Sequence, residues 1–201
     1  MFQYGQASAP AAKRYVRWKM MGQGELEAVR FFENYGFIVE KIKPSRQGEK
    51  TPDFRLSREG QLVAFAEVKS LDKAKYTQGK DPAYNRVSKH IDAAFKQFQA
   101  VNADQVVPNV LLIVNDNWTS DYQDLNAVID GYLPCEEGGR FQGFRKYSQG
   151  RIKHRKYDID LFVWLDLHGS NHLKFNLSRK KNFESLCRWF GVDPRQVEKS
   201  T

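Results

Sequence analysis

The sequence predicts a domain in which a mixed β-sheet is flanked by helices. Two stretches, beginning near residues 22 and 86, repeat apolar residues at helical spacing, and a strand-like segment follows each of them. Between them, two strand-like segments meet at the turn "REG" (58–60), which predicts a hairpin. This order fits an α/β or an α+β domain, and α/β is the class that we expect.

The first half of the chain supplies one helix and three strands. Leu26, Val29 and Phe32 recur at helical spacing from Gly22 onward, and Gly36 is a natural stop for this helix. The strands expected next are "FIVEKIK" (37–43), "DFRLS" (53–57) and "QLVAFAEVKS" (61–70), with a polar loop at 44–50.

The second half begins with a polar loop or lid at 71–85 and a helix at 86–101. That helix carries Val87, Ile91, Phe95 and Phe98 on one face. The later segments are a buried strand (107–115), a short helix (121–133), two strands (157–166 and 172–177) and a terminal helix (182–191). His168 and His172 lie in "HGSNH", where Gly-Ser-Asn predicts a hairpin turn rather than a zinc site.

We expect a single domain over residues 1–201, because this length suits one core. We divide it into an N-terminal arm (1–21), a core (22–115) and a C-terminal elaboration (116–201), which we expect to be basic and β-rich. The longest apolar runs are too short to cross a bilayer, so no membrane partner is expected. The N-terminus lacks the apolar core of a signal peptide, and Cys135 and Cys187 lie far apart, so a cytoplasmic location is the default.

Asp53, Glu67 and Lys69 are charged residues on the predicted hairpin. Glu67 and Lys69 are two apart and share one face of their strand, while Val68 faces the other way. A solvated hairpin is the ordinary explanation of such a pattern, but Glu67 stands in the apolar run "LVAFAEVK", where a charged group needs compensation. A divalent cation would relieve the repulsion between two carboxylates and would activate water for phosphodiester hydrolysis.

Pro52–Asp53 and Glu67–Val68–Lys69 resemble the signature of the PD-(D/E)XK nuclease superfamily. The upstream stretch "GELEAVRFFENYGFIVEKI" is similar to the first helix and strand of archaeal Holliday-junction resolvases. The resemblance covers residues 22–115 and implies a restriction-endonuclease-like sheet. It implies Glu25, Asp53, Glu67 and the carbonyl of Val68 as metal ligands, with Glu27 as the alternative to Glu25, and Lys69 as the catalytic lysine.

The resemblance also implies a cofactor and an assembly state. Mg²⁺ is the expected metal, and Mn²⁺ is expected to substitute for it. Many members of the superfamily are dimers, which leaves a homodimer open for this chain. Residues after 115 depart from the resolvases, so the resemblance speaks to the chemistry and leaves the substrate open.

The helix at 86–101 offers further candidates. Its stretch "SKHIDAAFKQ" is similar to a helix that follows the corresponding strand in certain bacterial toxin nuclease domains, where a Lys or Gln supports the site. Gln97 is therefore a candidate catalytic residue, and Lys89 is a candidate contact to nucleic acid. The alternative is a surface helix with solvated lysines and an unremarkable glutamine.

A basic segment spans residues 140–156, and no acidic residue occurs from Gly138 to Tyr157. Its candidate contacts to nucleic acid are Arg140, Arg145, Lys146, Arg151, Lys153, Arg155 and Lys156. Cations contact phosphates, and the interleaved aromatic residues can stack on bases. The whole chain carries a net charge of +8, which agrees with a polyanionic partner.

The sequence thus predicts a metal-dependent endonuclease that acts on DNA. Two alternatives stay open. One is an RNA endonuclease with the same site. The other is an inactive nucleic-acid-binding or assembly protein built on a nuclease fold, although the presence of Glu25, Asp53, Glu67 and Lys69 together argues against it.

Overall fold

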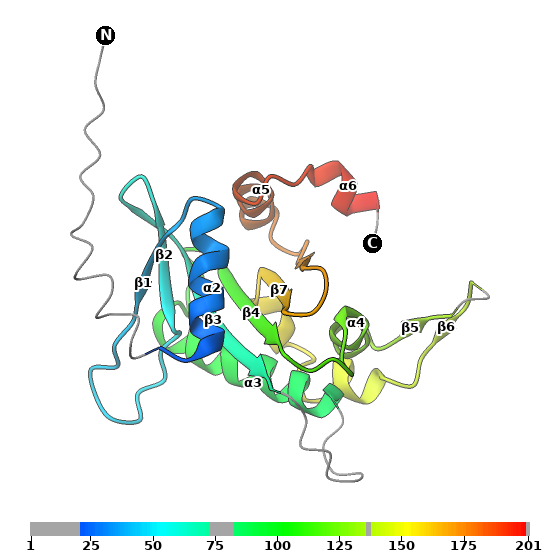
Figure 1. The fold of residues 1–201 in the computed structure, drawn as a ribbon. Helices are drawn as coiled ribbons and strands as arrows, with labels where there is room; N and C mark the ends of the chain where they lie inside the picture. The colour runs from blue at the N-terminus through cyan, green and yellow to red at the C-terminus, as the bar shows by residue number, and fades with distance from the viewer. Residues whose placement is uncertain (1–20, 73–82, 136–137, 200–201) are drawn as a thin grey trace.

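The computed structural model describes residues 21–72, 83–135 and 138–199. The expected N-terminal arm (1–21), apart from Met21, and most of the loop expected at 71–85 lie outside the described residues. Within the described part, the chain forms an α/β fold around a mixed, open, six-stranded sheet flanked by helices, as the sequence predicts (Figure 1).

The elements of the core follow the predicted order. They are α2 (Gln23–Asn34), β1 (Ile38–Lys41), β2 (Phe54–Arg58), β3 (Gln61–Leu71), α3 (Ala83–Val101) and β4 (Asn109–Asn115). The later helices and strands are α4 (Tyr122–Asp130), β5 (Leu133–Pro134), β6 (Arg140–Phe141), β7 (Leu161–Asp166), β8 (His172–Phe175), α5 (Lys180–Trp189) and α6 (Pro194–Lys199). A π-helical turn η1 (Tyr147–Arg151) and a 3-10 turn η2 (Arg155–Asp158) lie between β6 and β7.

The sheet order is β1-β2-β3-β4-β7-β8. The central strands β3, β4 and β7 run parallel, and the outer pairs are antiparallel. β2 and β3 form the predicted hairpin, in which Glu59 and Gly60 both adopt positive φ. β7 and β8 form the hairpin predicted for "HGSNH". These two strands extend the same sheet as the core.

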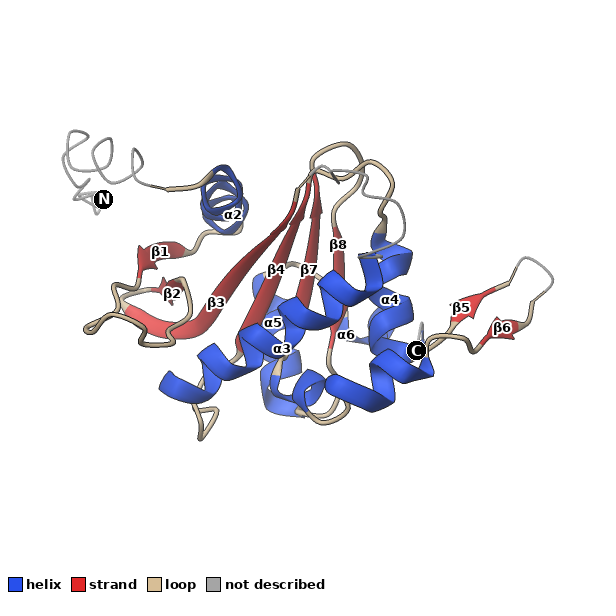
Figure 2. Ribbon diagram, turned by 90° about the horizontal axis from the view of Figure 1, so that it is seen from below, coloured by secondary structure: helices blue, strands red, loops and turns tan. Residues whose placement is uncertain are grey.

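Helices flank the sheet (Figure 2), and each face of the sheet has its own apolar core. α2 and α5 cover one face, where Phe32, Phe54 and Leu186 are buried. α3 and α4 cover the other face, where Ile91, Leu111 and Trp164 are buried. Because β4 is buried on both faces, its sequence is apolar from Val110 to Val114 and lacks the alternation of a half-exposed strand.

α2 forms and ends for local reasons that are visible in its sequence. The Glu25 carboxylate accepts a hydrogen bond from the Gly22 N–H at 3.2 Å, which satisfies one free donor of the helix start. At the other end, Gly36 adopts a φ of +79°, a conformation that costs glycine little. The helix therefore begins with Glu25 in its first turn, next to the end of the sheet where β2 begins.

The expectation of a β-rich C-terminal elaboration is wrong. Among the described residues after 115, those in helices and helical turns outnumber those in strands, and the two strands outside the main sheet, β5 and β6, form a short hairpin that extends away from the body (Figure 1). The spacing of Phe144, Tyr147 and Ile152 allows all of them to pack against the α3 face, which a flat hairpin would not. None of the described helices is both long and apolar enough to cross a bilayer.

The expected apolar face of α3 needs one correction. The buried stripe is Val87, Ile91, Ala94 and Phe98, and Phe95 is only half-buried. Phe95 instead lies beneath the Arg155 guanidinium, which is 5.7 Å from the ring centroid. The small side chain of Ala94 allows the helix to approach the sheet closely.

Candidate active site

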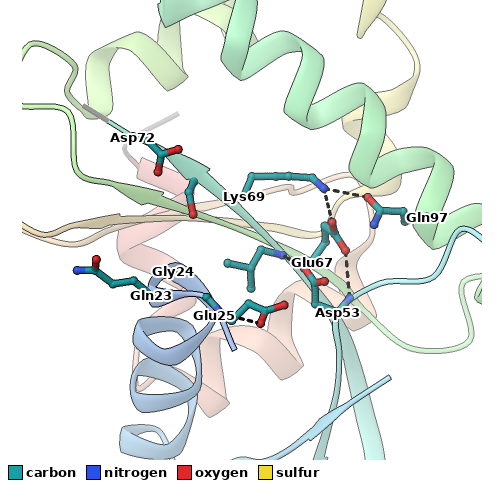
Figure 3. Close-up of a pocket in the computed structure, with 11 residues that line it drawn as sticks. Gln23, Gly24, Glu25, Asp53, Glu67, Lys69, Asp72 and Gln97 are labelled. Carbon is teal, nitrogen blue, oxygen red and sulfur yellow. Dashed lines mark hydrogen bonds and ion pairs between the residues drawn. The ribbon is translucent and has the colours of Figure 1, made fainter. Parts of the chain in front are cut away.

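A pocket opens beside β3 at the point where its neighbour β2 begins. Phe54, the first residue of β2, pairs with Ala66, and the following residues of β3 pair only with β4 on the other side. The space left beside β3 forms a pocket of about 400 Å³. It is lined by Gly22, Gln23, Gly24, Glu25, Asp53, Glu67, Val68, Lys69, Ser70, Asp72 and Gln97 (Figure 3).

Glu67 is the buried acid of this pocket, with 1% of its surface exposed. Its carboxylate accepts a hydrogen bond from the Asp53 N–H at 3.1 Å and forms an ion pair with Lys69. Burial is the main cause that raises the pKa of Glu67 to about 7, and the charge of Asp53 adds to it. Glu67 is thus an acid whose charged form requires a cation nearby.

Asp53 lies between Glu67 and Glu25. Its Oδ2 accepts a hydrogen bond from the Val68 N–H at 2.8 Å. Burial raises the pKa of Asp53, and the negative charge of Glu25 raises it further, while the Val68 N–H and Lys69 act in the opposite direction. Glu25 and Asp53 both line the pocket, and each carries a carboxylate that could serve a cation there.

The carbonyl of Val68 points to the same side as the carboxylate of Asp53. In an extended strand, the N–H and C=O of one residue point in the same direction. Because the Val68 N–H donates to Asp53, the Val68 carbonyl also faces the pocket, away from β4. The geometry therefore allows the role that the resemblance implies for this carbonyl.

A hydrogen bond between Lys69 and Gln97 connects strand β3 to helix α3, which covers this face of the sheet. The Lys69 Nζ contacts the Glu67 carboxylate and donates to Gln97 Oε1 at 3.2 Å (Figure 3). Gln97 Nε2 in turn donates to the Thr51 carbonyl at 3.0 Å. Gln97 thereby ties α3 to the loop that leads into Asp53. The structure places Gln97 at the site, as the sequence predicts, whereas Lys89 lies exposed nearer the start of α3 and is not among the residues that line the pocket.

Glu25 enters the pocket from α2, on the opposite face of the sheet from Gln97. A Cβ built on Gly24 would stand 2.3 Å from the Ser70 hydroxyl, so a glycine allows α2 to approach β3 closely. Both Glu25 carboxylate oxygens lie 2.7 Å from the Nζ of Lys41 on β1. Glu27, the alternative ligand, instead pairs with Arg30 on the helix surface and does not line the pocket.

The donors in the pocket fit a hard divalent cation. Carboxylate oxygens of Asp53 and Glu67 and the Val68 carbonyl are the ligand types that Mg²⁺ and Mn²⁺ accept. In the part of the chain that the structure describes, however, no three His, Cys, Asp or Glu side chains are already arranged around one metal position. Glu25 would have to leave Lys41, at least in part, to become the third acidic ligand.

The basic segment packs beside the first half of α3. Arg140, Arg145, Lys146, Arg151 and Lys153 are exposed, and Arg151 contacts Ser88 Oγ at 3.3 Å. Ser88 and Gln97 are nine residues apart, which is about 13 Å along a helix axis. Arg151 therefore lies on the α3 side of the molecule, on which Lys69 and Gln97 also lie, whereas Arg140 belongs to the β5–β6 hairpin that extends away from the body (Figure 1).

Arg155 and Lys156 differ from the other predicted contacts, because protein groups already engage them. Arg155 forms an ion pair with Asp92 on α3, and the Lys156 ammonium donates to the Ile129 carbonyl of α4. Burial lowers the pKa of Lys156. Both side chains are only half-exposed, so they stabilise the packing of η2 against α3 and α4.

Sequence reasoning missed Lys41, and it overlooked Gly24 and Ser70 as packing partners. Alternation along β1 offered a signal for Lys41, since it shares a face with Val39, which packs into the core beneath α2. No comparable signal exists for Gly24 and Ser70, because their contact depends on how the helix lies on the sheet.

Comparisons of this chain with protein-family models, with curated proteins and with solved structures gave no match.

Proposed function

We propose that this protein is a metal-dependent endonuclease that hydrolyses phosphodiester bonds of DNA. The observation that carries the proposal is the shared pocket, in which Glu25, Asp53 and Glu67 arrive from α2, the start of β2 and β3, with Lys69 beside them. Each element contributes one acidic residue at a point where the sheet leaves a gap. A surface hairpin with a solvated ion pair would not bury Glu67 in this way.

The residues of the chain have distinct tasks in this proposal. A Mg²⁺ ion held by Asp53, Glu67 and the Val68 carbonyl would supply Lewis acidity and a more acidic bound water. Lys69 keeps its ammonium within reach of the reacting phosphate, because Glu67 and Gln97 fix its end. There it can orient the attacking water and offset the charge that develops on the phosphate oxygens.

Cleavage assays test the proposal directly. We expect the purified protein to cut duplex, branched or single-stranded DNA when Mg²⁺ or Mn²⁺ is present, and EDTA to stop the reaction. RNA oligonucleotides in the same panel separate the two enzyme functions, since cleavage confined to RNA would identify an RNA endonuclease. Binding to DNA and RNA without cleavage of either would favour the inactive binding protein.

Lys69→Ala is the decisive variant. We expect cleavage to fall by at least about 100-fold, because removing one preorganised charge-stabilising group has this order of effect. DNA affinity, measured by fluorescence anisotropy, should stay within about twofold because Lys69 is one of many cations. Lys50→Ala, at an exposed position in the loop after β1, is the control and should cut normally. Full activity of the Lys69 variant would contradict the assigned role.

A further inference from the structure

Lys41 occupies a position that the proposed chemistry does not use. It is the last residue of β1 and pairs across the ladder with Phe54, immediately after Asp53. The next residue, Ile42, donates its N–H to the Asp53 carbonyl at 2.8 Å. Lys41 is thus anchored by its backbone next to one acid of the pocket while its side chain reaches another.

The contact between Lys41 and Glu25 is symmetric. The Nζ lies 2.7 Å from Oε1 and 2.7 Å from Oε2, so the ammonium caps both oxygens of the carboxylate. Exposed fractions of 31% for the Lys41 side chain and 22% for that of Glu25 show that water screens the pair only partly. A metal ion needs at least one of the same two oxygens.

The surrounding charges explain why a cation is favoured there. Glu25, Asp53, Glu67 and Asp72 line the pocket, and Lys69, its cation, pairs with Glu67. Lys41 is not itself a lining residue and approaches Glu25 from the β1 side. It therefore neutralises Glu25 without filling the pocket, which leaves room for an ion that would have to compete for the carboxylate.

The geometry points to Lys41 as a positioning residue that holds Glu25 at the pocket and competes with the divalent cation for it. The inference rests on the proposed function, because it assigns Glu25 to the metal. Metal binding then requires an exchange, in which Glu25 gives up part of its contact with the ammonium and gains one with the ion. The wild-type protein therefore binds the divalent cation more weakly than the same acidic residues would without Lys41.

The test measures Mn²⁺ binding to the full chain without substrate, from the free-ion signal in electron paramagnetic resonance. Lys41→Gln should bind Mn²⁺ about fivefold more tightly, which is the effect of removing a competing, partly buried ion pair. Lys41→Arg keeps the charge and should retain the wild-type affinity. Lys43→Gln removes the same charge at an exposed position two residues away and should change the affinity by less than about twofold.

A second set of variants shows whether Lys41 acts through Glu25. In a Glu25→Gln background, Lys41→Gln should have no more effect on Mn²⁺ affinity than Lys43→Gln has. Equal tightening by the Lys41 and Lys43 variants would overturn the inference and leave the metal centre intact. Absence of Mn²⁺ binding in wild type and in every variant would overturn the metal centre itself, and the inference with it.

Discussion

Glu67 shows how one residue can reveal a site. An acid in an apolar strand is costly, and the structure meets that cost with the Asp53 N–H and the Lys69 ammonium. Alternation along β3 correctly predicts that Glu67 and Lys69 share a face, and both lie on the α3 side of the sheet with Gln97. Their roles in catalysis stay predictions until cleavage is measured.

The raised pKa of Glu67 predicts a pH dependence of stability in metal-free protein. A pKa of about 7 in the folded state, against 4.5 for the free side chain, means that the folded protein binds this proton more tightly than the unfolded chain. The resulting stabilisation is complete below about pH 4.5 and is lost as the pH rises through about 7.

Glu67→Gln removes this titratable group, so the stability of the variant does not depend on its protonation. In urea unfolding with EDTA, we expect wild type to lose about 2 to 3 kcal/mol relative to the variant between pH 5 and pH 8, the part of the effect of the two pKa values that falls within this pH range. Acids far from Glu67 titrate alike in both proteins, so the difference reports on Glu67 together with Asp53, the acid whose charge acts on it. A constant gap over this pH range would contradict a protonated Glu67.

Among the elements, α2 determines where the third acid stands. Its first turn lies against β3 through Gly24 and Ser70, one residue away from Glu25. Alanine at a helical glycine ordinarily stabilises a helix by up to about 1 kcal/mol. At this position the added methyl group meets the Ser70 hydroxyl, which must rotate or push the helix away.

A double-mutant cycle measures this contact. We expect Gly24→Ala to lower the free energy of unfolding more in the wild-type background than in a Ser70→Ala background. The two effects should differ by about 1 kcal/mol in urea unfolding. Gly22→Ala is the control, since its added Cβ would meet nothing within 4 Å, and it should show no coupling to Ser70. Independent effects of Gly24→Ala and Ser70→Ala would contradict the close packing of α2 on β3.

The basic segment is the element that we expect to contact the nucleic-acid backbone. Replacing Arg145, Lys146 and Lys153 by Ala should make the slope of log affinity against log salt less steep by about 2 to 3 in DNA-binding titrations. The reason is that the variant makes fewer phosphate contacts and therefore releases fewer counterions when it binds DNA. These titrations use the Lys69→Ala protein so that the DNA stays intact.

Three exposed cations of α5 provide the control for the salt titrations. Lys180, Lys181 and Arg188 lie on the helix that covers the other face of the sheet. Replacing them by Ala removes the same charge and should leave the slope nearly unchanged. An equal decrease for both triple variants would show that net charge, rather than the basic segment, governs binding.

For the whole molecule, helix and strand identities were predictable where the pattern is local. The helical spacing of Val29 and Phe32, the turn at Gly60 and the apolar run at the centre of β4 each predict the element that forms. The prediction was wrong for the β-rich elaboration, because it rested on the strand patterns at 157–166 and 172–177 and did not include the helical turns η1 and η2. Tyr147 and Ile152 instead pack onto the α3 face, and this tertiary burial outweighs the local preference for a loop.

The sequence by itself determined which residues share a face and which of the longer helices and strands form, since these depend on alternation, caps and apolar spacing over a few residues, whereas it did not predict the short elements β5, β6 and α6. Only the tertiary structure decided that β2 begins beside Ala66 and leaves a gap, that Lys41 reaches Glu25, and that Arg155 and Lys156 are already engaged. These contacts join residues that lie between 16 and 63 positions apart or depend on sheet order. Such pairings are set by the packing of whole elements and leave no periodic pattern in the chain.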